Sequence, residues 1–315
     1  MSLLRFLGNL ILAIIVIALS ILILGSAYGA TMVRVQEQKG LDEGVTGGGW
    51  LWLEGQPIYY RTWGPSEGRA IVLVHGYQVE GSETWAPLAE NLARAGLRVV
   101  AVDLKGFGRS SREAPYEGLQ GQADVLGAAL NQMGLYGNTL VAHGWGAAVA
   151  ARLAAEQPQF VRQVVLIAPE APLPLPRWKE ILLKAPYLGR ALIWAEEDGG
   201  PLWKARHRRA FADPTLIPQD YWKRIAVPTQ IVGTAEALRA MALASQGEPV
   251  PLAFRVPTLI LVGERDRTLT EEKAQALAQE MPQATVRTIP EGGKYLHIEQ
   301  RAQVGRLIAQ WALSP

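Results

Sequence analysis

The stretch LVAHGWGAAVA, residues 140–150, decides the fold. The apolar run over 138–143 predicts the end of a buried strand, and the small residues over 146–157 predict a helix. Two glycines, Gly144 and Gly146, predict a tight turn between them, because glycine lets a strand pass into a helix where there is little room. The central residue of this turn is Gly144, which has no side chain for chemistry.

Apolar strand-like segments alternate with helix-like segments on both sides of this turn. Residues 50–64 predict a β-hairpin, and a later strand is expected to run from 97 into a Gly-rich loop. Further strands are expected at 70–76, 138–143, 161–169, 258–264 and 284–291, and helices at 84–96, 122–134, 146–157, 271–281 and 299–313. The strands are apolar on both faces, which indicates a mostly parallel, doubly wound α/β sheet covered by helices on both sides.

The alternation stops at residues 171–256, which are rich in proline, tryptophan and basic residues. We interpret this segment as a helical cap over the carboxyl edge of the sheet, where open α/β sheets bind ligands. The core is then divided into a first part, 50–170, and a second part, 257–315. We expect the tryptophans of the cap mostly to pack in its interior; they are Trp178, Trp194, Trp203 and Trp222. We expect His207 to be exposed to solvent.

Composition narrows the function classes. The chain has 315 residues, 49% hydrophobic and 19% charged, and its net charge of +2 gives no reason to expect nucleic-acid binding. It has no cysteine, which excludes disulfides, thiol catalysis and cysteine-bound metal. The four histidines lie in separate segments, so we expect no metal site, and no motif indicates a cofactor. Composition does not indicate the oligomeric state.

The N-terminus is strongly apolar. No charge occurs between Arg5 and Arg34, and the 19 residues from 6 to 24 are long enough to span the ~30 Å apolar core of a membrane. We expect residues 1–33 to form a single-pass anchor, followed by a flexible linker over 34–49, with the globular domain on the extracytoplasmic side. A cleaved signal peptide is the alternative, because small residues occur near 25–29.

Several short motifs stand where expected strands end. They are His75-Gly76-Tyr77, the turn at Gly144, GERDR at 263–267 and GGKYLHIE at 292–299. Their order and spacing, with DLKGFGRS at 103–110, resemble the α/β-hydrolase fold family of the serine-hydrolase lineage, over residues 50–313. The turn at 144 corresponds to the nucleophile elbow of that family, and helix 146–157 would point its N-terminus at the site.

The resemblance implies a role for particular residues. The backbone N–H groups of Tyr77 and Trp145 would form an oxyanion hole, and His297 would be the general base, oriented by a hydrogen bond to Asp266. His75 and His143 are expected to orient the turns, with Gly76 and Gly146 as motif residues. The departure is Gly144, where the family usually has a nucleophile. No acyl-enzyme can form at that position.

Three serines are alternative candidates for the nucleophile, and one glutamate is an alternative for the acid. Ser82, Ser110 and Ser111 are loop serines, which usually bond to nearby backbone. Glu170 follows the sixth strand, where some members of the family place the acid, but Asp266 fits that role better and we expect Glu170 to mark the entry into the cap. The basic segment 204–209 is expected to be an exposed helix face, with contact to anionic lipid as an alternative.

Three functions remain open at this point. The protein is an impaired hydrolase that binds a small apolar or acyl ligand, an enzyme that uses His297 and Asp266 with water or another nucleophile, or a structural, partner-binding membrane protein. A further possibility is that Gly144 is an inactivating substitution in an ordinary ester hydrolase. The sequence does not identify the ligand.

Overall fold

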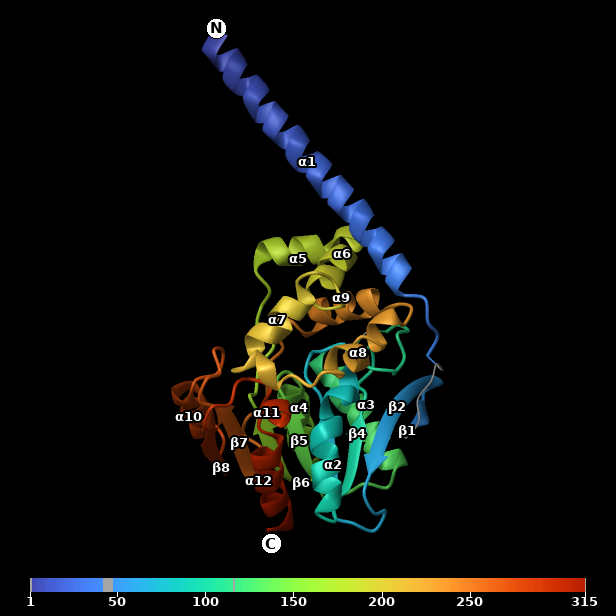
Figure 1. The fold of residues 1–315 in the computed structure, drawn as a ribbon, viewed down its shortest axis with the longest axis vertical. Coiled ribbons are helices and arrows are strands. Elements are labelled where there is room, and N and C mark those ends of the chain that lie inside the picture. Colours follow the sequence, from blue (N-terminus) through green and yellow to red (C-terminus); the bar gives the residue numbers. More distant parts are fainter. Residues whose placement is uncertain (1, 42–47, 116, 315) are drawn as a thin grey trace.

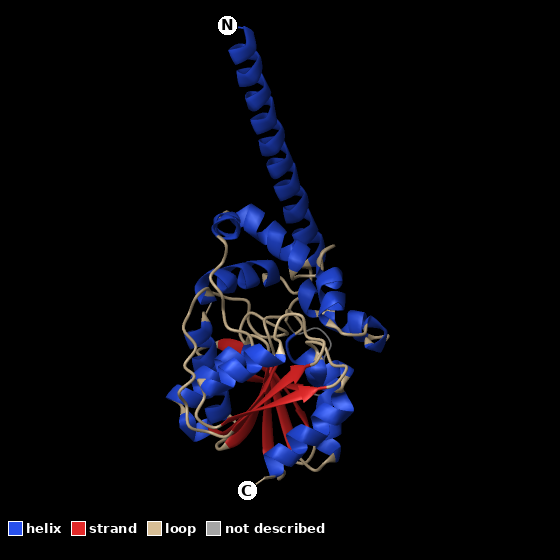
Figure 2. Cartoon of the chain, turned by 90° about the vertical axis from the view of Figure 1, so that its left-hand side faces the viewer, coloured by secondary structure: helices blue, strands red, loops and turns tan. Residues whose placement is uncertain are grey.

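The computed structural model describes residues 2–41, 48–115 and 117–314. Its centre is an eight-stranded sheet in the order β1-β2-β4-β3-β5-β6-β7-β8 (Figure 2). The β1–β2 hairpin is antiparallel, as predicted, and β3 to β8 run parallel to one another. The strands are β1 (Gly48–Leu53), β2 (Gln56–Trp63), β3 (Ala70–Val74), β4 (Arg98–Val102), β5 (Asn138–His143), β6 (Val161–Ile167), β7 (Thr258–Gly263) and β8 (Ala284–Ile289).

Helices cover both faces of this sheet, which gives the predicted α/β architecture. In β3, Val72 and Val74 pack into the core on one side, and Ile71 and Leu73 pack into the core on the other. The expected helix at 299–313 forms as α12 (Arg301–Leu313), and a short helix, α11 (Leu296–Glu299), precedes it. The covering helices are α2 (Ala86–Arg94), preceded by the short helix η1 (Gly81–Trp85), α3 (Leu119–Gln132), α4 (Gly146–Glu156), α10 (Glu271–Gln279), α11 (Leu296–Glu299) and α12 (Arg301–Leu313).

A helical cap lies between β6 and β7 in sequence and over the carboxyl edge of the sheet in space (Figure 1). Trp203 is buried in it, as expected, but Trp178 is 58% exposed on the outer side of α5. The expected packing of all four cap tryptophans is therefore wrong for Trp178. The cap helices are α5 (Arg177–Lys184), α6 (Pro186–Glu196), α7 (Trp203–Ala210), α8 (Tyr221–Ile225) and α9 (Thr234–Ser245), with the short helices η3 (Pro214–Leu216) and η4 (Pro228–Gln230).

The N-terminal helix α1 (Ser2–Gln36) extends away from the domain and packs on the cap with its last turns (Figure 1). It is long and apolar enough to cross a membrane, a property that a signal sequence shares. The Gln36 side chain donates to the carbonyl of Asp198, and the Glu37 carboxylate accepts from the amides of Gly233 and Ala235. The helix thus runs beyond the expected boundary at residue 33.

The expected linker over 34–49 needs correction for the same reason. Residues 34–36 are helical, and Lys39 pairs with Ile231 of the cap through backbone hydrogen bonds. A carboxylate at the start of α9 satisfies amides that a helix leaves unpaired, so this part of the segment is fixed and not flexible. Residues 42–47 of the expected linker lie outside the described residues.

The β5–α4 turn has the tight, left-handed backbone of a nucleophile elbow. Gly144 has φ of 54°, a left-handed conformation that glycine adopts without penalty. Two residues later, a Cβ atom on Gly146 would lie 2.1 Å from the backbone oxygen of His75. Glycine at 146 is therefore required for α4 to begin directly beside the end of β3.

We expect Gly146→Ala to lower the free energy of unfolding by about 1–3 kcal/mol, because the added methyl group must displace backbone. Chemical unfolding of the full chain in detergent, followed by circular dichroism, measures this change. Gly40→Ala is the matched control, because a Cβ atom at Gly40 meets nothing within 4 Å. Equal stability of the two variants would contradict the requirement.

Candidate active site

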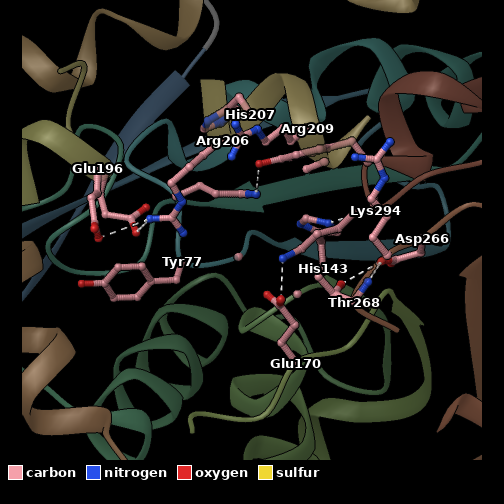
Figure 3. Close-up of a pocket in the computed structure, with 17 residues that line it drawn as sticks. Tyr77, His143, Glu170, Glu196, Arg206, His207, Arg209, Asp266, Thr268 and Lys294 are labelled. Carbon is pink, nitrogen blue, oxygen red and sulfur yellow. Dashed lines mark hydrogen bonds and ion pairs between the residues drawn. The ribbon is translucent and has the colours of Figure 1, made fainter. Parts of the chain in front are cut away.

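A cavity of about 430 Å³ lies between the cap and the carboxyl edge of the sheet, above the β5–α4 turn (Figure 3). Its floor is formed by the loops after β3, β5, β6, β7 and β8, and its roof by α6 and α7. The lining side chains are unusually rich in charge: Glu170, Glu196, Glu197, Arg206, Arg209, Asp266, Arg267 and Lys294. This lining differs from the apolar pocket that the sequence led us to expect.

The two backbone amides that the sequence assigned to an oxyanion hole lie at neighbouring turns. Tyr77 follows β3, Trp145 precedes α4, and these neighbouring strands bring the two turns together. A Cβ atom on Gly144 would lie 3.9 Å from the Cα atom of Gly76. Within the described part of the chain, the amides of Tyr77 and Trp145 have no hydrogen-bond acceptor. They are therefore available to a carbonyl or carboxylate oxygen of a ligand.

The space beside Gly144 is taken by a carboxylate from the next strand. The Glu170 amide donates to the Gly144 carbonyl over 3.0 Å, which fixes the chain after β6 beside the elbow. The Glu170 Oε2 atom lies 3.2 Å from where a Cβ atom of residue 144 would be. Its other oxygen, Oε1, accepts a hydrogen bond from the Lys294 ammonium group and forms an ion pair with it (Figure 3). An ion pair thus lies where the family resemblance predicted a nucleophile and its base.

His297 does not line this cavity. Its ring is fully buried, packs 4.5 Å from the ring of Trp85, and shares a hydrogen bond of 2.8 Å with the Thr84 hydroxyl through Nε2. The ring Nδ1 has no partner among the described residues. Lys294 and Tyr295, which precede His297 by three and two residues, reach the cavity instead.

The expected hydrogen bond between Asp266 and His297 is therefore not formed. Asp266 does line the cavity, but its Oδ1 atom accepts from the amide and hydroxyl of Thr268, both over 2.7 Å, and from the amide of Leu269. Its Oδ2 atom has no partner in the described residues. The turn after β7 holds this carboxylate locally, so its direction is set without the histidine.

The other histidines have distinct surroundings. His75 shares a bond of 2.7 Å with the Gly76 carbonyl through Nδ1 and accepts from the Leu104 amide, so it orients two turns as expected. His143 lines the cavity, its Nε2 lies 3.1 Å from the Lys294 carbonyl, and burial holds its pKa well below the usual 6.5.

The expected solvation of His207 is wrong. It is buried, forms a 3.0 Å contact with the Glu80 carboxylate and stacks on Tyr295, because α7 turns this side chain inward over the loop after β8. Its neighbours Arg206 and Arg209 line the cavity, so the basic segment 204–209 also contributes to the site. Arg206 forms ion pairs with Glu196 and Glu197 of the cap.

The loop serines have no place in the cavity. Ser110 is fully buried, donates to the Asp103 carbonyl and accepts from the Tyr59 amide. The Ser111 hydroxyl accepts from the Glu113 amide, and Ser82 is buried outside the cavity. The contacts of Ser110 and Ser111 agree with the usual behaviour of loop serines, whereas the buried Ser82 hydroxyl has no partner among the described residues.

A second, smaller cavity of about 170 Å³ adjoins the first and is apolar. It runs between α5, α6 and α9 and shares Tyr77 and Glu197 with the charged cavity. Its apolar lining comes from the cap and from the elbow: Tyr77, Trp145, Leu173, Leu175, Leu183, Ile193 and Ala242. We call this second cavity the apolar groove. Within the described residues, no cluster of His, Asp and Glu is suited to a metal ion.

Comparison with known proteins agrees with this architecture. The model of the alpha/beta hydrolase family matches residues 71–307. The chain belongs to this family. A haloalkane dehalogenase of Bradyrhizobium diazoefficiens is 23% identical over 289 residues, which are 82% of this chain and 91% of that protein. The lipase LipV of Mycobacterium tuberculosis is 29% identical over 63% of this chain and 78% of its own length.

Solved structures share the fold. A thermophilic esterase from Thermogutta terrifontis superposes with a TM-score of 0.67 at 24% identity, covering 81% of this chain and 93% of the esterase. This protein is thus an α/β hydrolase family member related to dehalogenases, lipases and esterases.

Sequence reasoning missed the pairing of Glu170 with Lys294. Both residues lie in stretches that the sequence singled out, since Glu170 follows the sixth strand and Lys294 lies inside GGKYLHIE. The family resemblance assigned the general base to His297, three residues later, so no role was predicted for Lys294. The sequence carries no signal for the register of the loop after β8. That register is fixed in the structure by the position of α11.

Burial lowers the pKa of His297 from 6.5 to about 3, which makes folding sensitive to acid. The unfolded chain binds a proton on this ring below pH 6.5, whereas the folded chain leaves it neutral. The stability linked to His297 is therefore complete above pH 6.5 and falls by on the order of 1 kcal/mol per pH unit as the pH drops toward 3.

We expect His297→Gln to lose less stability than the unmodified chain between pH 6.5 and about 4, because glutamine binds no proton there. Urea unfolding of the full chain in detergent at a series of pH values gives this difference. Parallel pH profiles of the two proteins would contradict a neutral, buried His297.

Proposed function

We propose that this α/β hydrolase family member is a membrane-anchored protein that binds an acyl compound without forming a covalent acyl-enzyme. The carbonyl or carboxylate group of the ligand would be held by the amides of Tyr77 and Trp145, and its acyl chain would lie in the apolar groove. The single observation that carries the proposal is Gly144 at the elbow, with both amides free of acceptors among the described residues. A ligand oxygen could then be bound where no nucleophile can attack its carbon.

The surrounding charges support a ligand with a polar head. Lys294 is paired with Glu170, and Arg206 with Glu196 and Glu197, so these charges are already balanced. Arg209 and Arg267 line the cavity and form no ion pair with the described residues. A carboxylate near these guanidinium groups would gain charge-assisted hydrogen bonds.

The contacts of α1 support an anchor that is retained. Tyr28 packs edge-on against Trp194, and Gly29 allows α1 to approach Ala191 of α6 closely. Both residues lie in the segment where a signal peptidase would cut. We propose that α1 remains attached, with the domain on the extracytoplasmic side as the sequence led us to expect.

The proposal predicts binding without covalent labelling. In lipid nanodiscs, the full chain should bind octanoate, as measured by titration calorimetry, and should not react with a fluorophosphonate probe. Ala242→Phe narrows the apolar groove and should weaken octanoate binding at least about tenfold.

Ala244→Phe is the matched control, because Ala244 lies on the same helix but is exposed to solvent. The Ala244→Phe variant should bind octanoate with the same affinity as the unmodified chain. It also controls for octanoate that partitions into the lipid of the nanodisc. Fluorophosphonate labelling of the unmodified chain, or equal octanoate affinity in both phenylalanine variants, would contradict the proposal.

The position of Glu170 favours a second candidate, hydrolysis of an ester by water. The Glu170 carboxylate would take a proton from water while the water oxygen bonds to the carbonyl carbon, and the amides of Tyr77 and Trp145 would hold the resulting oxyanion. When the oxyanion collapses, the C–O bond to the alcohol breaks and Glu170 returns the proton to the leaving alkoxide. No covalent intermediate is needed.

This second candidate predicts slow turnover of short acyl esters by the full chain. Glu170→Gln should reduce the rate at least about 100-fold, because the amide cannot accept the proton. Glu90→Gln, on the exposed side of α2, is the control and should leave the rate unchanged. Absence of turnover in the unmodified chain would exclude hydrolysis and leave ligand binding as the function.

A further inference from the structure

The height of the cap relative to the apolar part of α1 is fixed by direct packing. Tyr187 and Leu188 of α6 lie beside Leu22 and Ile23 of α1, where they line a shared surface groove. The 19 apolar residues of α1 that could cross a membrane end at Leu24. The start of α6 is therefore level with the end of the span, at about the depth of the lipid headgroups.

The outer surface of the cap at this level is apolar. Leu173, Trp178, Ile181 and Tyr187 are each more than half exposed. Trp178 and Ile181 are three residues apart on α5 and so lie on one side of that helix. Figures 1 and 2 show α5 and α6 as the part of the folded domain that reaches furthest along α1. We call these four side chains the cap patch.

The chemistry of the cap patch fits the interface of a bilayer. Tryptophan and tyrosine are enriched at this depth, where their rings are apolar and their polar groups reach water. Arg177 and Lys184, at the two ends of α5, are also exposed and would meet lipid phosphates. The patch is continuous with the apolar surface of α1 through Tyr187, so the same membrane would reach both.

We propose that the cap patch lies in the interface of the membrane that α1 spans, and that the apolar groove opens toward this membrane. Leu173 belongs to both the patch and the groove, and the groove leads past Leu175 and Leu183 to Trp145 and Tyr77. An acyl chain can therefore pass from the bilayer to the amides of the elbow along a lining that is mostly apolar, although it also includes Lys179, Glu197, Ser245 and Gln246. This inference rests on the proposed membrane anchor and gives the proposed ligand its source, the lipid bilayer.

The absence of cysteine from the chain permits a direct test. Single cysteines are introduced as Ile181→Cys, in the cap patch, or as Ser66→Cys, an exposed residue before β3 at the opposite edge of the sheet. Each full-length variant is labelled with an environment-sensitive fluorophore and reconstituted into phosphatidylcholine vesicles. A fraction of the lipid carries a nitroxide quencher near the headgroup, and flotation on a density gradient confirms attachment.

We expect quenching of at least about twofold at position 181 and none at position 66, because an interfacial helix lies 5–10 Å into the headgroup region. Protein that floats with the vesicles but shows no quenching at 181 overturns the docking of the cap while the anchor stands. Protein that fails to float overturns the anchor and the docking together. Neither result depends on octanoate binding, so failure of the ligand proposal is recognised separately.

Discussion

The close approach of α4 to the end of β3 is the constraint on which the site depends. Gly146 has no side chain, so the first turn of α4 can lie against the His75 carbonyl. This contact brings the turn after β3 beside the turn after β5, and with them the amides of Tyr77 and Trp145. The position of these two amides is thus a property of backbone packing and does not depend on a side chain at residue 144.

The absence of a side chain at Gly144 leaves room that residues from neighbouring loops occupy. Glu170 enters this space from β6, and Lys294 from the loop after β8 pairs with it. The ion pair between Glu170 and Lys294 is only partly exposed. Its two charges compensate each other beside a cavity lined by charged side chains. His297 packs between Trp85 and His143 and shares a hydrogen bond with Thr84, and burial keeps it neutral at physiological pH.

The cap connects the site to the N-terminal helix α1. Glu37 binds the start of α9, Trp194 of α6 contacts both Tyr28 and Gln36, and α9 in turn lines the apolar groove. Since these contacts are made by the segment that directly follows the apolar span, the orientation of the cap is coupled to the direction of α1. A helix joined in this way is held in one direction relative to the domain, which a flexible tether would not do.

The sequence by itself determined the order of strands and helices, the cap insertion and the elbow, because hydrophobic periodicity and turn glycines are local signals. It also marked Tyr77, Trp145 and Asp266 as residues at the carboxyl edge. Only the tertiary structure decided which side chains of GGKYLHIE face the cavity, because no local pattern shows that Lys294 and Tyr295 point into it while His297 is buried beneath it. The exposure of Trp178 and the docking of residues 34–39 are likewise decided by contacts between segments far apart in the chain.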